Sequence, residues 1–113
     1  MSFQPVSGML DACVLAVLSR EDVYGYFLTQ NVKEAFEVSE STLYPVLRRL
    51  ERDSCLTAYD VPYQGRNRRY YKITARGRDK FVNYVASWND YKRKIDRIFA
   101  GDMTGGGTKN DEA

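Results

Sequence analysis

The sequence predicts a mainly α-helical fold with one small β-hairpin. Apolar residues recur at helical spacing in four separate segments. Between the third and fourth of these lies a stretch typical of two short strands joined by a glycine-containing loop. The length of 113 residues and the hydrophobic share of 43% fit one domain with a modest core.

The first two helices are predicted from apolar stripes near the N-terminus. One helix is expected over about residues 8–19, and the next over about 23–36, with Asp22 as its N-cap. Cys13 falls on the first stripe, so we expect it to be a core residue.

A short third helix is expected from its N-cap Ser39 to about Asp53. At 100° per residue, the face opposite its apolar side begins with hydroxyl groups and continues with arginines. Pro45 on that face removes one intrahelical hydrogen bond unless it lies in the first turn. The outward face consists of Ser41, Pro45, Arg48 and Arg52, flanked by Thr42, Tyr44 and Arg49.

The predicted hairpin has strands at Leu56–Val61 and Arg69–Ile73. The loop between them, Pro62–Arg68, contains Gly65, Arg66, Asn67 and Arg68. We therefore expect a flexible, polar and basic tip.

A long fourth helix is expected over about residues 75–99, capped by Thr74. Its apolar stripe is too wide for a three-helix core to cover, so a second subunit is the expected cover. The alternative is a helix that folds back on its own chain. The predicted dimer contacts are Phe81, Val85, Trp88, Ile95 and Phe99. The predicted organisation is a DNA-binding domain over 1–74, a dimerisation helix over 75–100 and a disordered tail over 101–113.

The order helix, helix, helix, hairpin, helix is that of a winged helix-turn-helix, whose third helix enters the major groove of DNA. Charge agrees: residues 1–47 carry two basic and six acidic side chains, whereas residues 48–100 carry fourteen basic and six acidic. The alternative interpretation of these charges is a solvated basic surface. For Tyr44, the alternative to DNA binding is a side chain that packs beside the core. The candidate DNA-binding residues are Ser41, Thr42, Tyr44, Arg48, Arg52, Arg66, Asn67 and Arg68.

Several function classes are disfavoured by composition. Histidine is absent, and Cys13 and Cys55 form no CxxC pair, so no metal site and no cofactor are expected. No catalytic constellation is present, which argues against an enzyme. No apolar run reaches membrane-spanning length, and we expect a soluble, cytoplasmic protein. The alternative to a DNA-binding regulator is a winged-helix dimer that acts only as a protein–protein interaction module.

Three segments together resemble the PadR family of transcriptional regulators: Val23–Tyr26, Ser41–Glu51 and Arg68–Gly77. The resemblance extends from about Leu10 to Phe99. It implies a dimeric repressor that binds double-stranded DNA and whose two subunits pair through their last helices. The segment Ala86-Ser87-Trp88 resembles the compact members with one C-terminal helix, which include multidrug-responsive repressors.

In those relatives a tryptophan from each subunit lines a flat cavity for a small aromatic effector. The resemblance assigns this role to Trp88, with Phe81, Tyr84, Val85 and Ala12 as further lining residues. Lys92 stands where the multidrug-type relatives have an acidic residue. This departure favours neutral or anionic rings over cations, unless Asp96 or Asp11 neutralises the lysine. The alternative is that the two tryptophans pack together and fill the space.

Overall fold

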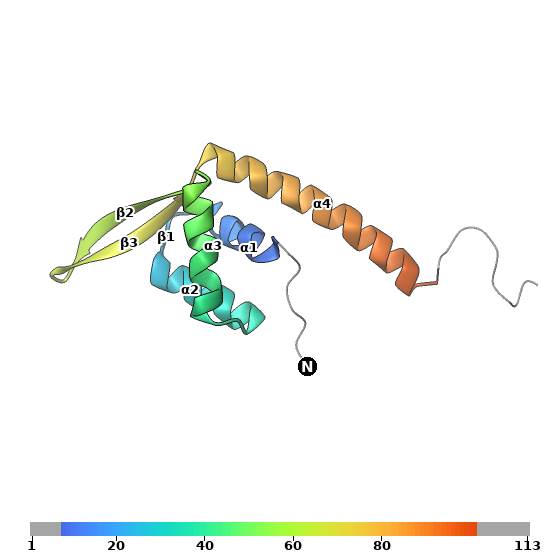
Figure 1. Ribbon diagram of the computed structural model, residues 1–113, viewed down its shortest axis with the longest axis horizontal. Coiled ribbons are helices and arrows are strands. Elements are labelled where there is room, and N and C mark those ends of the chain that lie inside the picture. Colours follow the sequence, from blue (N-terminus) through green and yellow to red (C-terminus); the bar gives the residue numbers. More distant parts are fainter. Residues whose placement is uncertain (1–7, 102–113) are drawn as a thin grey trace, which may run out of the picture.

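The computed structural model describes residues 8–101 and confirms the predicted fold class (Figure 1). Of the tail predicted over 101–113, residues 102–113 lie outside the described residues. None of the described helices is both long and apolar enough to cross a membrane. The elements are α1 (Met9–Leu18), β1 (Val23–Tyr24), α2 (Gly25–Phe36), α3 (Glu40–Arg52), β2 (Leu56–Tyr63), β3 (Arg66–Ile73) and α4 (Ala75–Phe99).

The core lies between α1, α2 and α3 and is closed by the inner end of the sheet. Leu15 of α1, Leu28 of α2 and Leu50 of α3 are each at most 1% exposed, and Leu56 of β2 completes the cluster. Burying a leucine side chain stabilises the fold by about 2 kcal/mol. The prediction that Cys13 belongs to this core is wrong, because Cys13 is only half-buried and is not part of the cluster.

The sheet has three antiparallel strands in the order β1-β3-β2. The short strand β1 was not predicted; Val23 and Tyr24 pair with Tyr71 and Tyr70. As a result α2 begins at Gly25, and the prediction that Asp22 caps it is wrong. Asp22 instead accepts a hydrogen bond of 2.6 Å from the Tyr59 hydroxyl.

The prediction of a long loop between the two hairpin strands, β2 and β3, is also wrong. Strands β2 and β3 form a hairpin, here called the wing, joined by Gln64 and Gly65 alone. Both residues have positive φ, 49° and 78°, as a type I′ turn requires. Pro62 pairs with Asn67, and an edge strand such as β2 tolerates proline because its outer side needs no donor. Figure 1 shows the wing projecting from the helices.

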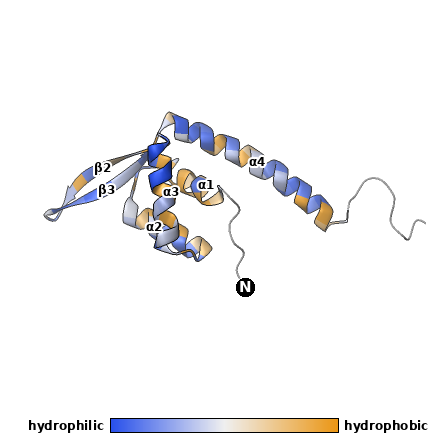
Figure 2. Cartoon of the chain, in the orientation of Figure 1, coloured by the Kyte–Doolittle hydropathy of each residue, from blue (hydrophilic) through white to orange (hydrophobic). Residues whose placement is uncertain are grey.

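Helix α4 is capped as predicted, since the Thr74 hydroxyl accepts a 3.0 Å hydrogen bond from the Gly77 backbone N–H. Gly77 is the one buried residue of this helix within the described chain. Beyond its first turns α4 extends away from the other helices (Figure 1). Apolar positions recur along it among hydrophilic ones and are prominent at its far end (Figure 2).

Candidate nucleic-acid interface and ligand pocket

The outward face of α3 is exposed as the sequence predicted. Ser41, Thr42, Pro45, Arg48 and Arg52 are exposed, and the side chain of Tyr44 is 48% exposed. Apolar positions of the same helix are buried: Leu43, Val46, Leu47 and Leu50. The spacing of the apolar residues therefore correctly predicts which side of α3 is exposed to solvent.

The start of α3 carries a cluster of hydroxyl groups. Ser39 occupies the N-cap position as predicted, but its side chain does not cap the backbone. Its Oγ lies 2.8 Å from Ser41 Oγ and 3.1 Å from Thr42 Oγ1. Pro45 lies inside the helix rather than in its first turn, and the helix continues through it.

Arg49 differs from its neighbours because it faces the body of the molecule. Its guanidinium lies 2.5 Å from Oδ1 of Asp11 in α1, and Lys80 Nζ of α4 lies 3.9 Å from the other carboxylate oxygen. The Asp11 side chain is only 8% exposed. Sequence reasoning considered Asp11 as a partner for Lys92. Among the described residues, Asp11 instead pairs with Arg49 and Lys80.

The wing arginines have different surroundings. Arg69 contacts both carboxylate oxygens of Glu51 at 3.1 Å and donates to the Tyr71 hydroxyl, a hydrogen bond that raises the pKa of Arg69. The guanidinium carbon of Arg68 lies 3.6 Å from the Tyr63 ring centre. Arg66 and Asn67 lie exposed beside the turn. The predicted wing residues are thus adjacent in space, but as strand rather than loop residues.

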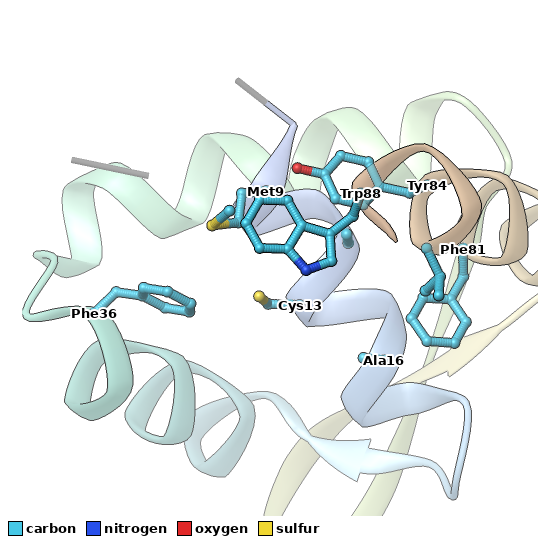
Figure 3. Close-up of a pocket in the computed structure, with 9 residues that line it drawn as sticks. Met9, Cys13, Ala16, Phe36, Phe81, Tyr84 and Trp88 are labelled. Atoms are coloured by element: carbon cyan, nitrogen blue, oxygen red, sulfur yellow. The ribbon is translucent and has the colours of Figure 1, made fainter. Parts of the chain in front are cut away.

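An apolar cavity of about 370 Å³ lies between α1 and α4 (Figure 3). Five of the predicted ligand residues line it, whereas Lys92 does not. Sequence reasoning missed Met9, Cys13, Ala16 and Phe36. Met9 and Ala16 were detectable, since each lies about one turn from Ala12 on α1. Figure 3 shows Phe36 of α2 across from the α4 side chains. The lining residues are Met9, Ala12, Cys13, Ala16, Phe36, Phe81, Tyr84, Val85 and Trp88.

Two titratable groups at this cavity have pKa values that burial raises, which favours their neutral forms. Burial raises the pKa of the Tyr84 hydroxyl and of the Cys13 thiol. No charged side chain lines the cavity among the described residues. The site therefore suits a ligand with an uncharged, apolar body.

The stripe on α4 continues past the cavity into the exposed part of the helix. Trp88 is 39% exposed, Ile98 59% and Phe99 81%. Phe81, in contrast, packs against the core of its own chain. The fold as described leaves an apolar surface on the second half of α4 that other parts of residues 8–101 do not cover.

Comparison with known proteins agrees with this architecture. Residues 14–83 match the transcriptional regulator PadR-like family. The transcriptional regulator Rv3488 of Mycobacterium tuberculosis is 43% identical over 75 residues, covering 66% of this chain and 70% of its own. The structure of smu.1704 from Streptococcus mutans has a TM-score of 0.81 and 37% identity, covering 92% of this chain and 99% of its own. A PadR family regulator from Clostridium difficile has a TM-score of 0.74 and 27% identity, covering 81% and 99%.

Proposed function

Because the chain belongs to the PadR-like family of transcriptional regulators, we propose that it is a cytoplasmic homodimeric repressor that binds a pseudo-palindromic operator in double-stranded DNA. The family implies regulation through DNA binding and a role other than catalysis. The observation that carries the finer proposal is the exposed outward face of α3 beside a basic wing. In this arrangement α3 enters the major groove and the wing reaches the neighbouring backbone or minor groove.

Each part of the α3 face has a role in this proposal. The hydroxyls of Ser41 and Thr42, at the start of the helix, bind phosphate together with the free backbone N–H groups there. Arg48 and Arg52 lie further along the same face and reach phosphates or guanine edges. Tyr44, half exposed between them, contacts the operator through its ring or hydroxyl.

Dimerisation is the reason to expect a symmetric operator. The uncovered stripe on α4 supports pairing of two α4 helices about a two-fold axis. Two α3 helices then lie about 34 Å apart, one turn of B-DNA, and read two inverted half-sites.

Titrations with duplex DNA from the promoter region of the protein's own gene test the proposal. Ser41→Ala, Thr42→Ala and Tyr44→Ala should each weaken binding to this duplex more than binding to a scrambled duplex. Arg93→Ala, an exposed charge on α4, is the control and should leave both affinities unchanged. Unchanged affinity in all three α3 variants would refute the assigned face. A wild-type protein with no salt-sensitive binding would favour the protein–protein interaction module.

The apolar cavity supports a second element of the proposal, release by a ligand. Trp88 lies midway along the stripe, so its copy in a two-fold dimer lies near the axis. Two indole rings then bind a planar aromatic molecule between them, walled by Tyr84 and Val85. The ligand lowers DNA affinity by shifting the spacing of the two α3 helices.

Ligand charge and cavity occupancy are testable by Trp88 fluorescence, because this is the only tryptophan. Planar neutral or anionic aromatics should quench it, and Lys92 near the dimer axis should disfavour cations. Lys92→Glu should shift the preference towards cationic dyes. Quenching by cationic dyes alone would refute the charge argument. Absence of quenching by any of them would indicate that the two tryptophans fill the space.

A further inference from the structure

One face of the wing carries a continuous array of tyrosines and one arginine. Tyr59 and Tyr70 stack across β2 and β3 with ring centres 5.7 Å apart. Tyr24 of β1 continues the array 5.8 Å beyond Tyr70. Arg68 closes it, with its guanidinium carbon 3.6 Å from the Tyr63 ring centre and 4.7 Å from that of Tyr24. A guanidinium placed over tyrosine faces is attracted by the ring electrons.

Arg68 therefore connects strands that do not pair with each other. Strand β1 pairs with β3 only through Tyr70 and Tyr71, so the outer wing has just two strands. A two-stranded hairpin is marginally stable by itself in water. The contacts of Arg68 reach from Tyr24, beside the start of α2, to Tyr63, next to the turn. They join the outer wing to the body of the domain.

The three wing arginines consequently differ in how far their guanidinium groups remain free to bind DNA. Arg69 is paired with Glu51, and Arg68 lies between two rings. Arg66, directly after the turn, has no ion pair, side-chain hydrogen bond or ring contact within residues 8–101. Its five donors are all available to an external acceptor.

We propose that Arg68 is a positioning residue, clamped by Tyr24 and Tyr63 to hold the wing in a preset orientation, and that Arg66 is the wing arginine that contacts DNA. This rests on the proposed DNA binding and revises the sequence-based assignment of Arg68 as a direct ligand. A wing already held in place loses less conformational entropy when the complex forms. The clamp thus contributes to affinity without touching DNA.

The clamp itself is tested on the free protein by amide hydrogen exchange over residues 61–68. Tyr63→Leu removes one ring, and Arg68→Lys keeps the charge but loses the planar group. Each should speed exchange in the outer wing by about two- to fivefold, the equilibrium equivalent of one exposed cation–π contact. Tyr63→Phe keeps the ring and is the matched control, with wild-type exchange expected. Wild-type exchange in both Tyr63→Leu and Arg68→Lys would overturn the clamp.

DNA titrations at several salt concentrations then separate the two arginines. Arg66→Ala should weaken binding and reduce the salt slope by about 0.9, as loss of one phosphate contact does. Arg68→Lys should weaken binding by about two- to fivefold with the slope unchanged. Wild-type affinity in Arg68→Lys, together with a reduced slope in Arg68→Ala, would make Arg68 a phosphate ligand and overturn the proposal. If the wild-type protein binds no DNA, the proposed function fails, while hydrogen exchange still decides the clamp.

Discussion

The two ends of α4 have similar amphipathic sequences but very different surroundings. At the N-terminal end, Thr74 caps the helix and also donates from its hydroxyl to the Ser54 carbonyl at 2.6 Å. Gly77 is buried against Cys55, and Phe81 packs on the core. At the C-terminal end, Ile98 and Phe99 are more than half exposed. Among residues 8–101, the contacts between α4 and the other elements thus end about halfway along the helix.

This contrast separates two kinds of apolar residue that periodicity treats alike. The first kind completes the core of one chain, and the second forms a surface that monomeric proteins rarely leave open. The boundary falls near Trp88, where the cavity between α1 and α4 also ends. A ligand or a second chain that acts on this boundary acts where the support of α4 by its own chain ends.

The first prediction concerns the fixed end. A methyl group at Gly77 would overlap the Cys55 carbonyl oxygen and lie 2.8 Å from Ile73 Cγ1. Gly77→Ala should therefore lower the free energy of unfolding by about 3 kcal/mol, as overpacking against backbone does. Urea unfolding provides the measurement. Ser87→Ala, exposed on the same helix, should change stability by less than about 0.5 kcal/mol. Equal stability of the two variants would show that the end of α4 is not fixed as described.

The second prediction concerns the open end. Ile95→Glu with Phe99→Glu places two carboxylates on the apolar stripe of the second half of α4, where Ile95 is half-buried and Phe99 exposed. The dimer dissociation constant should rise at least about a hundredfold, because the charges would be buried unpaired between subunits. Sedimentation measures this, and Asn83→Glu with Ala86→Glu on the opposite face is the control of equal charge. A folded, unaltered dimer in the Ile95/Phe99 variant would rule out pairing through α4.

Much of this organisation was predictable, because apolar periodicity locates the helices and also identifies the exposed face of α3. The wing was misjudged for local reasons: Pro62 and a run of polar residues are typical of a loop, yet an edge strand exposed on both sides accepts them. Strand β1 has two residues, too few to produce a pattern. The Arg68 clamp and the Asp11–Arg49 pair join residues far apart in the sequence. No periodicity reports such contacts, so only the fold reveals them.

A smaller effect is expected where the fixed end of α4 meets the other helices. Asp11 joins α1 to Arg49 of α3 and Lys80 of α4. Asp11→Asn keeps the shape but removes the charge, and should lower stability by about 1–2 kcal/mol because Arg49 is half-buried without a counter-ion. Asp90→Asn, whose partners Lys94 and Arg93 are exposed, is the control and should have no measurable effect on thermal unfolding. Equal melting temperatures for the two variants would show that the Asp11 contacts do not stabilise the domain.

The smallest effect, and the one that reports directly on the boundary, is the reactivity of Cys13. Cys55 is buried, so alkylation of the native protein should occur at Cys13, and Cys13→Ser should abolish it. Burial raises the pKa of the Cys13 thiol, and only the thiolate reacts, so labelling near neutral pH should be slower than for a free cysteine. The rate should rise with pH over a higher range than for an accessible thiol, since a raised pKa delays deprotonation.

Because Trp88 and Tyr84 line the same cavity, a bound aromatic ligand should slow labelling further. The Ile95/Phe99 variant, without its partner α4, should label faster than the wild-type dimer. Identical rates for dimer, variant and ligand-bound protein would separate Cys13 from the dimer interface and show that the cavity on α1 plays no part in the response.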